Sequence, residues 1–203
     1  MPPPPAAEPP IHPARLRRAR DCLRRGGLLA YPTEAVFGLG CDPLRPDAVL
    51  RLLRLKRRPL RAGLILIAAD PDQLAPYLAP LPAARRRVVN ATWPGPVTWI
   101  WPARPGTPDW LTGGRDSIAV RLTAHPLARA LCRAWGGALV STSANPHRRP
   151  PARTALQVRR YFGDHLDLIL HGATGPARRP TEIRDARTGA RLRAGDGPGS
   201  AAG

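Results

Sequence analysis

The sequence predicts a single α/β domain, in which a β-sheet is flanked by helices. Apolar runs of strand length, such as residues 63–68, alternate with segments whose apolar residues recur at helical spacing, such as residues 14–25. The chain has 203 residues with 43% hydrophobic content, enough for one full core and too short for two comfortable ones. The Pro-rich residues 1–13 and residues 196–203 are predicted to be flexible, so residues 14–195 are expected to form the domain.

The formal net charge of +18 results from 32 arginine and lysine residues against 14 acidic ones. Such a charge suits a polyanionic partner, because cationic side chains neutralise phosphates. The arginines are spread along the chain instead of forming one block, which together with the many alanines and prolines also indicates a general compositional bias. No apolar run reaches the roughly 18 residues that a membrane helix needs, so we expect a soluble protein without membrane contact.

The cysteines and histidines predict neither a disulfide framework nor a metal site. Cys22, Cys41 and Cys132 are widely spaced and odd in number, which fits a reducing cytoplasm best. The five histidines show no paired spacing of metal ligands.

The first element of the predicted sheet is a short buried strand over residues 28–31. Pro32 ends it, because proline has no backbone N–H to donate. The chain then turns at Thr33–Glu34, which leaves a hydroxyl and a carboxylate at a strand end, where ligands bind in α/β sheets. Gly38 and Gly40 allow the backbone to approach another group closely. A polar turn between core elements is the alternative interpretation.

A second helix is predicted to be capped by Asp47 and to end near Lys56. Pro59 disfavours the α region for Arg58, so the chain from Lys56 to Arg58 is expected to be extended, with both side chains on one face. Lys56 is the only lysine of the chain. We expect it where a compact ammonium, unlike a planar guanidinium, can hold a carboxylate or phosphate in a tight site. The alternative is that this position has kept a lysine by chance, while the other cationic positions are arginine.

The remaining elements follow from the same patterns. Further strands are predicted over residues 63–68, 97–101, 117–122, 138–144, 166–170, 181–185 and 191–194, and further helices over residues 72–78, 83–92, 126–135 and 154–162. Trp99 and Trp101 share one strand face with Val97, and core packing is favoured for them over stacking with bases.

Two of these strands carry polar residues on one face. Ser117 shares a face with Arg121, and Ser141 shares a face with Ser143 and Asn145, because alternate residues of a strand point the same way. These faces are candidate binding surfaces, and a solvent-facing edge is the alternative for the second. The chain has neither a P-loop nor a G-x-G-x-x-G motif, so arginines, hydroxyls and backbone amides must hold any nucleotide.

Seven short motifs occur in a fixed order along the chain: YPTEAVFGLGCDP, LKRRP followed by GLILIA, WPGPVT, DSIAVR, HPL, STSAN and TEIRDA. In this order and at these separations they resemble the YrdC/TsaC family, the threonylcarbamoyl-AMP synthases, over residues 14–195. The chain looks like the short branch with one domain. The resemblance implies a twisted mixed β-sheet flanked by helices, with a concave, positively charged groove.

The resemblance also implies a reaction. Family members join L-threonine, bicarbonate or CO2, and ATP into L-threonylcarbamoyl-AMP and release pyrophosphate, which makes them nucleotidyltransferases. Partner proteins then transfer the threonylcarbamoyl group to the adenosine beside the anticodon of tRNAs that read codons beginning with A. Mg2+ is expected on the triphosphate, without a carboxylate cage of its own. Direct contact with tRNA or other RNA is left open.

The family's functional positions fall on ten residues of this chain. Its Lys-x-Arg and Ser-x-Asn motifs, implied to be catalytic, fall on Lys56, Arg58, Ser143 and Asn145. Its threonine contacts fall on Thr33, Arg121, Ser141 and Thr181, and its ATP contacts on Arg58, Ser117, Ser143 and Arg193. The chain departs from the family pattern at residues 146–149 and at residues 62–63, and no contact is carried over there.

Two other functions stay open at this point. The first is an RNA-binding or ribosome-maturation factor of the same fold that grips double-stranded RNA by its shape. The second is an enzyme that makes a plain carbamoyl adenylate, like the similar domain of hydrogenase-maturation carbamoyltransferases. Those domains occur in much longer chains with zinc-finger and acylphosphatase-like parts, which this sequence does not contain.

Overall fold

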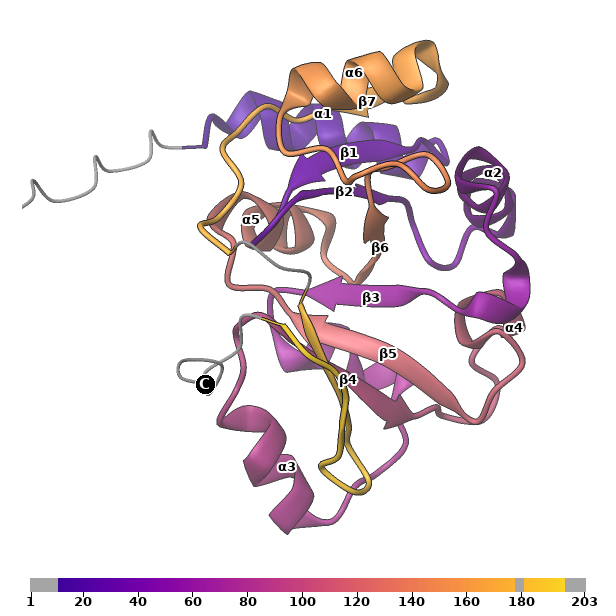
Figure 1. Cartoon of the computed structure of the whole chain (residues 1–203), viewed down its shortest axis with the longest axis vertical. Helices are drawn as coiled ribbons and strands as arrows, with labels where there is room; N and C mark the ends of the chain where they lie inside the picture. Colours follow the sequence, from indigo (N-terminus) through magenta and orange to yellow (C-terminus); the bar gives the residue numbers. More distant parts are fainter. Residues whose placement is uncertain (1–10, 178–180, 196–203) are drawn as a thin grey trace, which may run out of the picture.

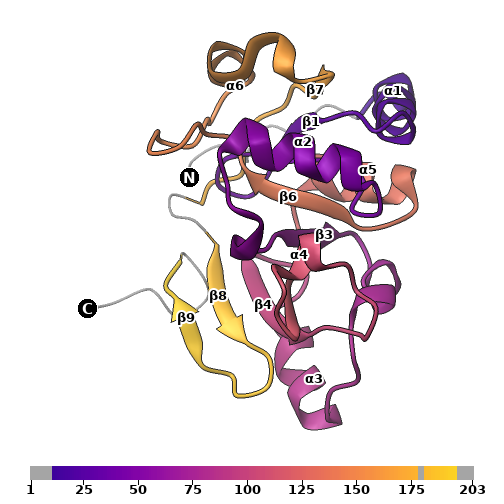
Figure 2. The same cartoon turned by 90° about the vertical axis from the view of Figure 1, so that its right-hand side faces the viewer.

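The structure is a computed structural model, which describes residues 11–177 and 181–195. Within these residues, nine strands form one mixed sheet in the order β7-β1-β2-β6-β3-β5-β4-β8-β9 (Figures 1 and 2). The strands are β1 (Leu29–Pro32), β2 (Phe37–Gly40), β3 (Ile65–Ala68), β4 (Val97–Pro102), β5 (Ser117–Leu122), β6 (Leu139–Ser143), β7 (Leu168–Ile169), β8 (Glu182–Asp185) and β9 (Arg191–Arg193). The predicted α/β class is therefore confirmed.

Helices connect and cover these strands. They are α1 (Pro13–Arg24), α2 (Pro46–Lys56), α3 (Ala83–Asn90), α4 (Asp109–Thr112), α5 (Pro126–Trp135) and α6 (Ala155–Phe162). Thr154 caps α6 as predicted, because its hydroxyl accepts the N–H of Gln157. The predicted helix over residues 72–78 is instead two short 3-10 helices, Pro71–Gln73 and Ala75–Tyr77.

The central strand β3 separates two hydrophobic clusters. Leu66 belongs to one and Ile67 to the other, because successive side chains of a strand point to opposite faces. On the Ile67 side, α1 and α5 pack against each other and supply buried residues such as Leu23 and Leu131. The opposite cluster contains Trp99, only 1% exposed, together with Val97 and Trp101, which confirms that this strand face packs into the core.

The strand β2 was not predicted, because its sequence, FGLG, alternates apolar residues with glycine. It pairs with β1 on one side and β6 on the other. A Cβ added to Gly40 would lie 2.3 Å from the carbonyl oxygen of Val140 and 2.8 Å from the hydroxyl of Tyr31. Glycine at this position therefore lets β2 pack tightly against β6 and the side chain of Tyr31.

Both predicted details of α2 are wrong, although the helix ends at Lys56 as expected. Arg45 is the N-cap residue, Pro46 occupies the first turn, and Asp47 lies one position inside the helix and pairs with Arg45. At the other end Arg57 has φ 48° and ψ 41°, a left-handed conformation that closes the helix. The chain between Lys56 and Arg58 is thus turned, and the expected extended backbone does not form.

Candidate functional site

A cavity of about 540 Å³ opens on the sheet where β2, β3, β5 and β6 meet the turn after β1. Four arginines from separate parts of the chain line it, and we call it the arginine-lined cavity: Arg58, Arg115, Arg121 and Arg193. The described lining contains hydroxyl side chains but no carboxylate and no imidazole. Such a lining favours an anionic ligand.

All eight residues predicted to contact threonine or ATP line this one cavity: Thr33, Arg58, Ser117, Arg121, Ser141, Ser143, Thr181 and Arg193. Strand alternation accounts for part of this convergence. Ser117 and Arg121 reach the cavity from β5, while Val120 and Leu122 between and after them lie in the core. The structure brings these residues together, and their separate roles stay predictions.

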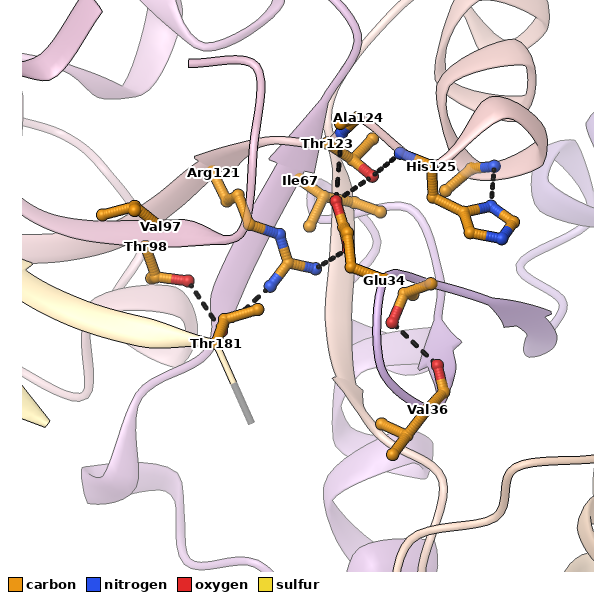
Figure 3. A network of polar contacts seen from close by, with 12 residues as sticks. Glu34, Val36, Ile67, Val97, Thr98, Arg121, Thr123, Ala124, His125 and Thr181 are labelled. Atoms are coloured by element: carbon orange, nitrogen blue, oxygen red, sulfur yellow. Dashed lines mark hydrogen bonds and ion pairs between the residues drawn. The ribbon is translucent and has the colours of Figure 1, made fainter. Parts of the chain in front are cut away.

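Arg121 is the most enclosed cation of the cavity, with only 5% of its surface exposed. Its Nη1 donates to Oγ1 of Thr181 at 3.1 Å, and its Nη2 lies 3.4 Å from Oε2 of Glu34 (Figure 3). Thr181 is in turn 3.3 Å from the hydroxyl of Thr98. The guanidinium is thus held between the turn after β1 and the start of β8.

Glu34 lies behind Arg121 and does not line the cavity. One carboxylate oxygen, Oε1, accepts hydrogen bonds from Oγ1 of Thr123 at 2.8 Å and from the N–H of Ala124 at 3.0 Å. Burial alone would raise the pKa of Glu34, but the charge of Arg121 and the hydrogen bonds outweigh burial and lower this pKa. Sequence reasoning placed Glu34 in the turn but did not count it as a site residue.

Lys56 lies behind Ser143, outside the lining, and is 8% exposed. Its ammonium donates to the carbonyl oxygen of Ser143 at 2.6 Å, to Oδ1 of Asn145 at 2.8 Å and to the carbonyl oxygen of Asn145. A compact ammonium was predicted here, and it holds chain oxygens where a carboxylate or phosphate was expected. Burial, followed by the charge of Arg58, lowers the pKa of Lys56 to about 8.

Asn145 links Lys56 to the loop that departs from the family pattern. Its Oδ1 also accepts the Ser143 hydroxyl at 2.7 Å, and its Nδ2 donates to the carbonyl oxygens of Arg149 at 2.8 Å and Pro146 at 3.2 Å. Lys56 and Asn145 therefore set the position of Ser143, which lines the cavity, without lining it themselves.

The other cavity arginines are fixed by carbonyl oxygens. Arg58 donates to Ala62 and Gly63, and Arg193 donates to the carbonyl oxygen of Thr181 at 2.9 Å. Burial, with the charge of Arg115 second, lowers the pKa of Arg58. Because like charges repel one another here, an anion in the cavity would relieve this repulsion. Sequence reasoning missed Arg115, which lies in the loop before β5.

The structure offers no protein-held metal site in the parts of the chain it describes, since no three His, Cys, Asp or Glu residues gather there. The three cysteines, Cys22, Cys41 and Cys132, are free and buried. None of the helices within residues 11–177 and 181–195 has both the length and the apolar character that crossing a bilayer requires.

The fold and the cavity define an α/β protein with an arginine-lined cavity on its mixed sheet. A family model described as telomere recombination, which covers Sua5, YciO and YrdC, matches residues 21–195. Because this match spans most of the chain, the chain belongs to the Sua5/YciO/YrdC family, as the sequence motifs predicted.

Two relatives named threonylcarbamoyl-AMP synthase, from Halorhodospira halophila and Nitrosococcus oceani, are each 60% identical to the chain. The matches cover 91% and 88% of this chain and 97% of each relative. Among solved structures, P. abyssi Sua5 complexed with L-threonine is 31% identical, with a TM-score of 0.82 over 87% of this chain. The chain spans only 52% of that Sua5 chain, but it spans 93% of E. coli YciO, which is 26% identical with a TM-score of 0.83.

Proposed function

We propose that the chain is a nucleotidyltransferase that makes L-threonylcarbamoyl-AMP and pyrophosphate from L-threonine, bicarbonate or CO2, and ATP. The observation that carries this proposal is the convergence of all eight predicted substrate contacts on one arginine-lined cavity. The 60% identity to relatives named for this product supports it. The L-threonine complex of P. abyssi Sua5 supports threonine as one substrate.

The cavity lining suggests how the two substrates would lie. Arg121, the buried guanidinium, suits the bidentate grip that the threonine carboxylate needs. Thr181 and Thr33 carry the hydroxyls that would read the threonine side chain. The nucleotide would occupy the part of the cavity with Arg58, Ser117, Ser143 and Arg193, whose cations and hydroxyls match phosphate oxygens.

The chemistry needs positioned substrates more than a titrating group of the protein. The threonine amine adds to CO2 and loses a proton, giving a carbamate whose oxygen attacks the α-phosphorus and expels pyrophosphate. The described lining has no carboxylate or imidazole to act as a base, so the chain's contribution is orientation and the neutralisation of charge that develops on the phosphates. Arg58, which lines the cavity, would supply part of this neutralisation.

Mg2+ would enter with ATP as part of the substrate and would offset part of the negative charge of the triphosphate. The product would then be consumed by partner proteins that modify N6 of an adenosine in tRNA. We propose that this chain and those proteins act in the cytoplasm.

The test is pyrophosphate release by the purified full chain with ATP, Mg2+, bicarbonate and L-threonine. We expect release that stops when threonine or bicarbonate is omitted, and a nucleotide product with the mass of threonylcarbamoyl-AMP. Tight binding of double-stranded RNA with a steep salt dependence, and no threonine-dependent release of pyrophosphate, would instead favour the RNA-binding alternative.

A further inference from the structure

The turn after β1 supplies a buried carboxylate, that of Glu34, which lies behind the arginine-lined cavity. Glu34 and Arg121 are 8% and 5% exposed, so both charges of the pair are largely removed from water. Oε1 of Glu34 is held by Thr123 and Ala124, which leaves Oε2 facing Nη2 of Arg121 at 3.4 Å. Figure 3 shows the two side chains pointing toward each other, with Thr181 on the far side of the guanidinium.

We propose that Glu34 is a positioning residue for Arg121, and that it thereby determines how tightly the site binds the carboxylate of its amino-acid substrate. This inference rests on the proposed function, because it needs threonine as a ligand of Arg121.

The reason is the behaviour of a buried guanidinium. A cation without a counter-charge is strongly disfavoured at this depth, so Arg121 without Glu34 would turn toward other acceptors or draw in water. A guanidinium has five N–H donors, and the described residues engage it only at Nη1 and Nη2, while Nε has no partner among them. Glu34 and Thr181 therefore fix the plane of the guanidinium without using up its donors.

The backbone at Glu34 is fixed as well. Its carbonyl oxygen accepts the N–H of Ala177 at 3.1 Å, and the carbonyl oxygen of Thr33 accepts the N–H of Gly175 at 2.9 Å. A Cβ added to Gly175 would lie 2.6 Å from the carbonyl oxygen of Glu34, so the turn at residues 33–34 and the segment at residues 175–177 are in close contact. Glu34 thus has a rigid support from which to orient Arg121.

A merely structural role makes a different prediction. Loss of a buried carboxylate that only stabilises the fold would lower the melting temperature. It would also change the KM for threonine and the KM for ATP by the same factor, without selectivity for threonine. The chain contains a matched control, Glu182, which is 3% exposed, accepts Nε of Arg184 at 2.8 Å and does not line the cavity.

The experiment compares Glu34→Gln and Glu182→Gln with the wild-type chain in pyrophosphate release, with melting temperatures recorded for all three. In Glu34→Gln we expect the KM for L-threonine to rise about tenfold or more, the loss for a misaligned charge-assisted hydrogen bond. The KM for ATP should stay within about twofold, and Glu182→Gln should change neither KM. An unchanged threonine KM in Glu34→Gln, or an equal rise in both KM values, would overturn the inference.

A second variant keeps the test decisive if Glu34→Gln does not fold. Thr123→Val leaves the Glu34 charge in place and removes one of its two anchors, so we expect the threonine KM to rise about threefold with the ATP KM unchanged. An unaltered threonine KM in that variant would refute the inference. A wild-type chain that releases no pyrophosphate with threonine would refute the proposed function itself, which is a separate outcome.

Discussion

The ammonium of Lys56 lies 2.8 Å from Oδ1 of Asn145 and so ties the last residue of α2 to the loop that follows β6. The same ammonium also reaches the carbonyl oxygens of Ser143 and Asn145. Three acceptors around one nitrogen match the three N–H bonds of an ammonium. A guanidinium, which is planar, cannot present its donors in this arrangement.

We therefore predict that Lys56→Arg loses most of the pyrophosphate-release activity, nearly as much as Lys56→Ala. Each change leaves buried acceptors unsatisfied and lets Ser143 move away from the cavity, and we expect each to lower the free energy of unfolding by about 1 to 3 kcal/mol. Steady-state kinetics with thermal melting measures both effects. The exposed Arg54, two residues earlier, gives the control Arg54→Lys, which should behave like the wild-type chain.

The ionisation of Lys56 can be observed directly, because it is the only lysine of the chain. With 13C-labelled lysine, the Cε signal should titrate with a pKa of about 8, below the ordinary value of 10.5. Arg58→Ala removes a neighbouring positive charge and should move the midpoint upward. A midpoint at the ordinary value in the wild-type chain would contradict the prediction.

The lowered pKa of Lys56 also predicts how the free energy of unfolding depends on pH. Between about pH 8 and 10.5 the Lys56 side chain is protonated in the unfolded chain and deprotonated in the folded chain. The unfolded state thus binds more protons, so the contribution of Lys56 to the free energy of unfolding increases with pH in this window. A comparison of chemical denaturation of the wild-type chain and Lys56→Ala across this window would show the difference.

Arg58→Ala should impair nucleotide use more than threonine use. Arg58 lines the cavity with its guanidinium fixed by the carbonyl oxygens of Ala62 and Gly63, so the change removes a preset cation. We expect a rise of about tenfold or more in the KM for ATP, the loss for a charge-assisted hydrogen bond to phosphate. The neighbouring Arg54→Ala, which is exposed, should keep the wild-type KM. A KM for ATP unchanged in Arg58→Ala would remove this residue from the nucleotide site.

Gly40→Ala should destabilise the fold, because its Cβ would lie 2.3 Å from the carbonyl oxygen of Val140, a backbone atom of the neighbouring strand. We expect a decrease of about 1 to 3 kcal/mol in the free energy of unfolding, the usual cost of overpacking. Gly137→Ala is the matched control, since its Cβ would meet only the Trp135 side chain at 3.5 Å. Urea denaturation of the two variants measures the difference, and equal midpoints would contradict the prediction.

Strand alternation predicted much of the site from sequence. Ser117 with Arg121, and Ser141 with Ser143, reach one cavity because a regular strand fixes the direction of each side chain. This inference needs no knowledge of the partner strands, so it holds wherever the strand itself is recognised.

Other features depend on contacts that local sequence does not reveal. Arg57 adopts a left-handed conformation, which reverses the expected path between Lys56 and Arg58, because closing the helix satisfies its last carbonyl oxygens. Glu34 meets Thr123 across 89 residues of chain, and no spacing rule predicts such a pairing. The strand β2 was missed because its glycines have low strand propensity, which tight packing overrides.

The parallel pairing of β8 with β4 places residues from the last part of the chain beside a strand from its middle. Thr33 and Arg193 line the same cavity although they come from opposite ends of the sequence. A ligand that contacts both would act as a reversible crosslink, closing nearly the whole chain into one loop. Its binding energy would then oppose unfolding of the entire molecule, including fraying of the terminal β8–β9 hairpin.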